Sequence, residues 1–271
     1  MFKLNKSGYY DWKNRKPSNR EIECKQATDQ VKSIYAASKG RYGSPKVTRE
    51  LNRMGLKISR PRVARIMRSE GLKSIICKKF RGATTESNHS FPVAENILKR
   101  NFSASRPSHK WVSDITYIPT DQGWLYLTII MDLFDRKIVG WSLSTDMTTQ
   151  NTVLAAWRMA LINRPATKGL IFHSDRGVQY AAYDFKDVLK GENTIQSMSR
   201  KGNCWDNAVA ENFFKILKSE MVKHVRFRCI LQAKNDIFEF IEIWYNRQRK
   251  HSYLGHKTPE EFNKINYSKC A

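Results

Sequence analysis

The chain has 271 residues and 41% hydrophobic content, which suffices for one large domain or two smaller ones with a buried core. Five scattered cysteines without a Cys-x-x-Cys pair argue against a disulfide framework, and no apolar run is long enough to span a bilayer. The formal net charge of +23, from 48 Lys and Arg against 25 Asp and Glu, predicts a polyanionic partner, with nucleic acid as the first candidate. We therefore expect a reduced cytoplasmic protein that does not enter a membrane.

The positive charge is concentrated toward the N-terminus. Residues 1–100 hold 24 basic and 8 acidic side chains, a net charge of +16, whereas the remaining 171 residues hold 24 and 17, a net charge of +7. This asymmetry predicts a DNA-binding region over residues 1–72 and a more balanced globular body after it.

Glycine and proline positions predict three helices in the basic region, over residues 21–39, 44–54 and 59–71. The last two are short and are joined by a tight turn at Gly55, which describes a helix-turn-helix. One face of the third helix is arginine-rich and could contact phosphates or guanine edges through Arg60, Arg62, Arg65 and Arg68. The alternative is a basic helical hairpin that is only solvated.

Residues 73–106 have no sustained hydrophobic period, so we expect a linker with one short helix near 94–99. Residues 107–225 follow as a separate domain, and residues 226–271 are expected to extend it with helices. Near the end of that extension, three basic residues are expected to face DNA, namely Arg247, Arg249 and Lys250.

The second domain is predicted to contain five strands. Three consecutive antiparallel strands come first and two later strands alternate with helices over residues 150–163 and 182–189; the strands span 111–119, 124–132, 137–144, 169–173 and 194–197. This order of elements is that of the ribonuclease-H-like fold. The predicted class is therefore α/β, with a mixed five-stranded sheet and helices, preceded by an all-α helix-turn-helix domain.

A helix over residues 202–220 is predicted to have two unlike faces. Its apolar face repeats at helical spacing through Ala210, Phe213, Phe214 and Leu217, and a second face carries Glu211, Lys215 and Lys218. Asn203 or Asp206 is expected to cap its start. A carboxylate with two lysines suits a metal beside a phosphate backbone, and the simpler alternative is a solvated salt bridge between Glu211 and Lys215.

Three carboxylates occupy informative places in this order of elements. Asp114 lies within the first strand, Asp175 follows the fourth strand, and Glu211 lies on the helix after the fifth. In this fold the first and fourth strands are neighbours, so the two aspartates can converge and the helix can bring the glutamate to them. Clustered carboxylates repel one another, and Mg²⁺ or Mn²⁺ would offset that repulsion. Two such ions can support in-line phosphoryl transfer.

Other polar and aromatic residues have structural interpretations beside functional ones. Asp132 and Asp135 border a tight turn, where turn chemistry and surface pairing are expected. His173 could assist a water or a phosphate, or it could form a structural hydrogen bond. Trp205 could stack on a base near the site, but packing in the core is favoured.

Four motifs carry a family resemblance. The stretches 111–118, 173–180 and 203–211, with 35 residues between Asp175 and Glu211, resemble those of the Asp-Asp-35-Glu transposases of bacterial insertion sequences, which are relatives of the retroviral integrases. A fourth stretch over 245–259 is similar to theirs as well. The resemblance covers about residues 25–265, nearly the whole chain.

The resemblance implies metal-dependent cleavage of element-end DNA and transfer of the freed 3′-hydroxyl into a target phosphodiester. Asp114, Asp175 and Glu211 match the metal-binding triad, and Lys215 and Lys218 correspond to basic residues that touch the DNA end. It also implies binding of two ions, assembly as a homo-oligomer on double-stranded DNA, and a nucleoid-associated bacterial protein. Family members of this length are often fused by a frameshift to an upstream reading-frame product.

Two other functions compete with transposition. A non-catalytic DNA-binding regulator of transposition would use the helix-turn-helix and keep a silent core. A structure-selective nuclease of the same fold would cleave DNA without strand transfer. The intact triad argues against the regulator, and the motif over 245–259 together with the basic excess argues against the nuclease.

Overall fold

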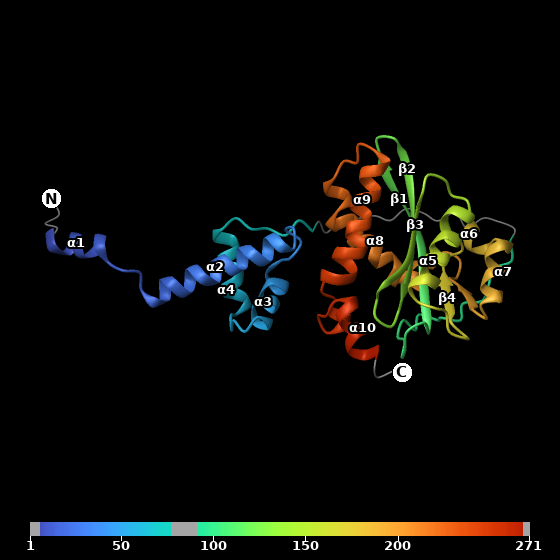
Figure 1. Ribbon diagram of the computed structural model, residues 1–271, viewed down its shortest axis with the longest axis horizontal. Coiled ribbons are helices and arrows are strands. Elements are labelled where there is room, and N and C mark those ends of the chain that lie inside the picture. Colours follow the sequence, from blue (N-terminus) through green and yellow to red (C-terminus); the bar gives the residue numbers. More distant parts are fainter. Residues whose placement is uncertain (1–5, 77–90, 268–271) are drawn as a thin grey trace. The chain divides into compact units, whose positions relative to one another are not determined.

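A computed structural model describes residues 6–76 and 91–267, and these form parts of two compact units, Met1–Ile76 and Cys77–Ala271. The described part of the first unit is all helical (Figure 1). It contains α1 (Lys6–Asn14), α2 (Asn19–Ala37), α3 (Ser44–Arg53) and α4 (Arg60–Ser69). The portion of the predicted linker over 77–90 lies outside the described residues.

The helix-turn-helix folds around the apolar faces of α2, α3 and α4. Their buried side chains are Ala27, Val31, Val47, Leu51, Val63, Ile66 and Met67. Gly55 ends the α3 turn with a φ of +90°, a backbone conformation that glycine adopts without strain. The Asn52 side chain then accepts a hydrogen bond from the Ile58 amide at 3.0 Å, which fixes the path into α4.

The second unit is built on a mixed five-stranded sheet in the order β3-β2-β1-β4-β5. The strands are β1 (Lys110–Thr120), β2 (Gly123–Asp132), β3 (Ile138–Ser144), β4 (Ile171–Ser174) and β5 (Ile195–Met198). The first three pair antiparallel through short turns, whereas β4 and β5 run parallel to β1. The mixed sheet confirms the predicted fold class.

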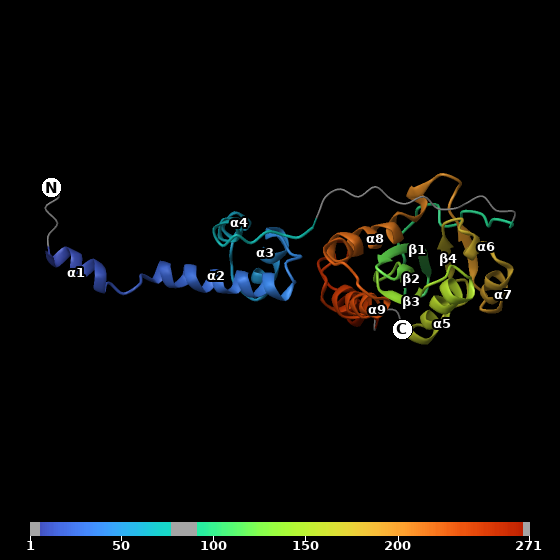
Figure 2. The same cartoon turned by 90° about the horizontal axis from the view of Figure 1, so that it is seen from above.

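Helices cover both faces of this sheet (Figure 2). One side carries α5 (Ala155–Asn163), α6 (Val178–Ala181) and α7 (Tyr183–Gly191), and the other carries α8 (Ala208–Glu220), α9 (Ile230–Phe238) and α10 (Pro259–Tyr267). The core beneath α5–α7 is rich in aromatic rings, including Trp111, Trp157, Phe172, Tyr180 and Phe185. A Cβ at Gly140 of β3 would overlap the Ala156 carbonyl oxygen, so α5 packs directly on the strand backbone.

Several helical segments differ from the predicted ones. The predicted helix at 150–163 begins as a π-helix, Gln150–Leu154, and α9 continues into another, Glu239–Gln248. The described residues 91–109 contain no helix, so the short helix predicted near 94–99 is absent. The described residues of this unit also contain three 3₁₀ turns, Cys204–Asn207, Val222–His224 and Ser252–Leu254. Within the described residues no helix is long and apolar enough to cross a membrane.

Candidate active site

Asp114 and Asp175 are aligned by the parallel pairing of β1 with β4. Val112 of β1 pairs with His173 of β4. Asp114 lies two residues after Val112, and Asp175 lies two residues after His173. Because side chains alternate along a strand, Asp114 and Asp175 are expected on the same face. Trp111 and Phe172, one residue earlier than the pair, both belong to the core beneath α5–α7. The two aspartates therefore belong to the opposite face, which α8 covers.

Glu211 reaches this face from the first turn of α8. The apolar stripe of the helix, Ala210, Phe213, Phe214 and Leu217, is buried as its spacing predicted. The Asn207 side chain donates a hydrogen bond of 2.9 Å to the carbonyl of Ser113, the residue before Asp114. This bond fixes the start of α8 beside the strand that carries the first aspartate. Neither Asn203 nor Asp206 caps the helix as predicted.

The electrostatics of the three carboxylates indicate that their charges act on one another. Burial, and next the charge of Asp175, raise the pKa of Asp114 well above its ordinary value, and Glu211 adds to that rise. Burial also raises the pKa of Glu211, with a smaller contribution from Asp175 that opposes the effect of Lys215. Uncompensated negative charge of this kind is what a bound cation removes.

The geometry is open rather than closed around an ion. Asp114 accepts a 2.9 Å hydrogen bond from the Ile115 amide, and Asp175 accepts one of 2.9 Å from Gly177. In the described residues, no three His, Cys, Asp or Glu side chains are close enough together to hold a metal ion as they stand. The donor set is all oxygen and suits Mg²⁺ or Mn²⁺, so the residues fit such an ion once the carboxylates draw together.

Buried polar groups lie next to the two aspartates along β1 and β4. The His173 ring is buried between Ser197 and Ser199, with N···O distances of 2.9 and 3.2 Å, and burial lowers its pKa to about 4. It is therefore neutral and structural near pH 7. On the other face, the buried Tyr180 hydroxyl lies 2.8 Å from that of Ser113.

Comparisons with known proteins show the family of the chain. Models described as "Integrase core domain" match residues 104–204 and 193–259, and one described as "HTH-like domain" matches residues 21–80. The transposase InsF for insertion sequence IS3A of Escherichia coli is 40% identical over 98% of this chain and 92% of its own length. The chain belongs to the insertion-sequence transposase family. Another relative, an uncharacterized 31 kDa protein of insertion element IS600 from Shigella sonnei, is 41% identical over 97% of this chain and 96% of its own length.

A solved structure supports the fold of the transposase. A chain of the simian T-cell lymphotropic virus intasome, in complex with a PP2A regulatory subunit, aligns with a TM-score of 0.50 and 14% identity. The alignment covers 86% of this chain and 73% of the viral one. At that identity the likeness concerns the fold alone, an integrase-type core like the one predicted from the order of elements.

Two basic residues of the transposase do not lie where we predicted. Arg249 is buried and pairs with the buried Glu220 at 2.9 Å, and Lys250 pairs with Glu261 at 2.8 Å. Arg249 ties the C-terminal extension to the end of α8, and Lys250 ties it to α10, because each side chain pairs with a carboxylate of the protein. Neither side chain faces DNA as predicted. Arg247 is exposed and remains a proposed DNA contact. Thr258 and Glu261 form a capping box at the start of α10.

The lysines of α8 lie near the triad. Lys215 is exposed and its ammonium is 3.9 Å from Glu211, at the limit of a salt bridge, so the simple ion-pair interpretation accounts for little stability. Lys218 is half-buried; burial lowers its pKa, whereas the charge of Asp114 acts in the opposite direction. Both positions suit a phosphate approaching the carboxylates.

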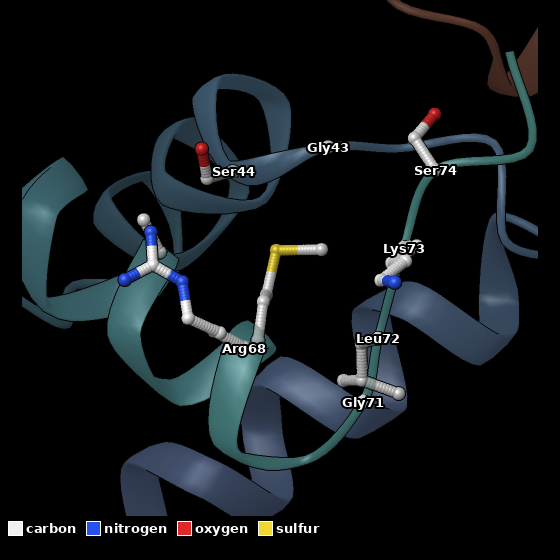
Figure 3. A pocket seen from close by; sticks show the side chains of 9 residues that line it. Gly43, Ser44, Arg68, Gly71, Leu72, Lys73 and Ser74 are labelled. Carbon is white, nitrogen blue, oxygen red and sulfur yellow. The ribbon is translucent and has the colours of Figure 1, made fainter. Parts of the chain in front are cut away.

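The arginine face of α4 is accessible in the first unit. Arg60, Arg65 and Arg68 are exposed and Arg62 is half-buried. Arg68 also borders a pocket of about 290 Å³ between the start of α3 and the segment after α4 (Figure 3). Lys73 lines the same pocket, so its rim carries two positive charges.

An ion cluster at Asp206 ties the start of α8 to the segments around it. The buried carboxylate accepts hydrogen bonds of 2.8–3.0 Å from Arg200, Arg100 and Asn96. These bonds join the segment before β1, the loop after β5 and the turn before α8. The hydrogen bonds from Arg200, and next those from Arg100, hold the pKa of Asp206 well below its ordinary value.

We expect Asp206→Asn to destabilise the catalytic unit by about 1–3 kcal/mol, because charge-assisted hydrogen bonds to a buried group are lost. The native pKa is depressed, so the contribution of Asp206 is present above the ordinary value of 3.8 and disappears as pH falls through the native pKa. Urea melts of both proteins at several pH values measure this. The difference between them should shrink below pH 4, and a constant difference would contradict the assignment.

Proposed function

We propose that this transposase cleaves double-stranded DNA at the ends of its insertion sequence and joins the freed 3′-hydroxyl to a target phosphodiester, with Asp114, Asp175 and Glu211 holding two Mg²⁺ ions, or Mn²⁺ in their place. The observation that carries the proposal is the placement of three mutually interacting carboxylates on the α8 face of the sheet. When bound, the divalent ions activate the attacking oxygen and stabilise the leaving one.

Other residues of the protein would position the carboxylates and bind the DNA. The pairing of β1 with β4 supports a common face for Asp114 and Asp175, and the hydrogen bond from Asn207 to the Ser113 carbonyl ties the start of α8, which carries Glu211, to β1. Lys215 and Lys218 on the same helix would hold the phosphate backbone next to the carboxylates. Arg247, in the C-terminal part of the protein, would make a further contact with DNA. The arginines of α4 would bind the duplex separately, as in a helix-turn-helix.

Intact carboxylates favour catalysis over the regulator alternative. The test is an assay of the purified chain with labelled element-end duplexes, a target plasmid and Mg²⁺. We expect nicked ends and joined products that chelation by EDTA abolishes. Binding without either product would favour the regulator, and nicking without joining would favour a nuclease. Repeating the assay with the upstream reading-frame product shows whether that partner is needed, and sizing the DNA complex tests the proposed homo-oligomer.

We expect Arg62→Ala with Arg65→Ala to weaken DNA binding and to flatten its salt dependence. Each lost phosphate contact lowers the slope of log K against log salt by roughly 0.9, so the double variant should lose about two units of slope. Fluorescence anisotropy on a labelled duplex at several salt concentrations measures it. Lys190→Ala, an exposed lysine of α7 with 79% of its side chain accessible, is the matched control and should leave the slope almost unchanged. An unaltered slope in the double variant would count against the helix-turn-helix assignment.

A further inference from the structure

Trp205 is an exposed indole in the turn that precedes the helix carrying Glu211. It has 69% of its surface accessible and lies in the 3₁₀ turn Cys204–Asn207, which leads directly into α8 and Glu211. Packing in the core was the favoured prediction, and the structure overturns it. Exposure of so large an apolar ring loses the free energy that burial would provide, so a contact outside the monomer is the natural explanation.

The turn holds the indole in a fixed place. The next residue, Asp206, is fully buried in its cluster with Arg100 and Arg200, and Asn207 after it is bonded to the Ser113 carbonyl. Two anchored neighbours restrict the backbone on which Trp205 stands. The exposure of the ring is therefore a property of the folded turn.

The charge around the ring selects the kind of partner. Lys201 precedes Trp205 and is exposed, Arg200 is exposed and ion-paired with Asp206, and Lys215 is exposed on the helix that follows, 3.9 Å from Glu211. An apolar surface of a protein partner would have to approach past Lys201 without neutralising its charge. A nucleic acid offers both a negative charge and a flat surface, because its phosphates neutralise the cations and its bases present π-faces to the indole. Bases inside a duplex have both faces covered and a terminal base pair exposes one face, so an unpaired base offers the indole the most accessible surface for stacking.

We propose that Trp205 stacks on an unpaired base at the DNA end and so holds the strand next to Glu211. This inference rests on the proposed function, since it assumes that a DNA end enters the carboxylate site. It adds a substrate property, namely a preference for ends with at least one unpaired base over fully paired ends.

The test uses the full chain and duplexes that carry 2-aminopurine either in a two-nucleotide overhang or within the paired region. Stacking on an indole quenches 2-aminopurine, so wild-type protein should quench the overhang probe and bind it more tightly than the paired probe. Trp205→Ala should lose the quench and bind the overhang probe roughly 5- to 100-fold more weakly, the range that stacking one base supplies. Trp205→Phe should retain part of both effects.

Two controls separate this inference from the catalytic proposal. Trp124→Ala removes another exposed indole, 56% accessible, which pairs with Pro119 five residues beyond Asp114, and it should bind like wild type. Glu211→Gln should lose cleavage and keep the Trp205-dependent quench. Equal quenching by wild type and Trp205→Ala, with cleavage intact in wild type, overturns the stacking inference alone. A Trp205-dependent quench in a wild-type chain that cleaves no DNA supports the inference and overturns the proposed function.

Discussion

Glu211→Gln is expected to abolish Mg²⁺-dependent cleavage and joining while leaving DNA binding almost unchanged. The substitution keeps the shape of the side chain and removes its negative charge, so the metal loses one anionic ligand. We expect the rates of both steps to fall by at least about 10²–10³-fold, the scale of losing one electrostatic contact to a charged transition state. Single-turnover assays on labelled element ends measure the rates, and anisotropy measures the binding.

A matched control makes this result specific to the site. Glu192→Gln makes the same chemical change at an exposed glutamate that follows α7 on the other side of the sheet, and it should react at the wild-type rate. Mn²⁺ binding, followed by electron paramagnetic resonance, should weaken only in the Glu211 variant. Wild-type joining by Glu211→Gln would remove this residue from the proposed triad.

Arg164→Met is expected to destabilise the catalytic unit by about 3–5 kcal/mol. Arg164 donates to the buried Asp132 at 2.7 Å and to the buried Asp135 at 2.7 Å, and only 11% of its side chain is exposed. Removing the cation leaves two carboxylates buried without their counter-charge, which is the costly way to break a buried ion pair. Thermal unfolding should show a fall in Tm of roughly 10 °C for a unit of this size.

An exposed ion pair provides the control for the stability lost in Arg164→Met. Arg226 and Asp121 lie 3.1 Å apart with 85% and 40% of their side chains accessible, so Arg226→Ala should change stability by less than about 1 kcal/mol. The triple variant Arg164→Met, Asp132→Asn, Asp135→Asn should recover part of the stability, because it removes the unpaired charges. Equal effects of Arg164→Met and Arg226→Ala would contradict the role of the buried cluster.

The catalytic fold was predictable because its signals are local and repeated. Strand alternation, short turns and the apolar stripe of α8 each restrict a segment, and their order then selects the mixed sheet. The triad prediction depends on the same logic: Asp114 and Asp175 follow from the expected neighbours β1 and β4. The assignment of these residues to a metal site stays a prediction that the variants above test.

Long-range pairing accounts for the features that could not be predicted. Asp132 and Asp135 looked like turn residues at the surface, yet Arg164, about thirty positions later, allows them to be buried. Arg249 looked like a DNA contact because nothing nearby in sequence reveals Glu220 as its partner. Trp205 is the opposite case, since its hydrophobicity favoured burial and only the anchored neighbours Asp206 and Asn207 explain its exposure.

The pairing of β1 with β4 has a consequence for how this protein can change over evolution. The two aspartates share a face only because each lies an even number of residues beyond the pair Val112 and His173. Inserting or deleting one residue between a pair member and its aspartate would turn that carboxylate into the opposite core. The loop between β3 and the following helix has no such parity and can vary in length. Selection should therefore tolerate length changes in that loop and remove them within the three-residue segments 112–114 and 173–175, whatever the new residue is.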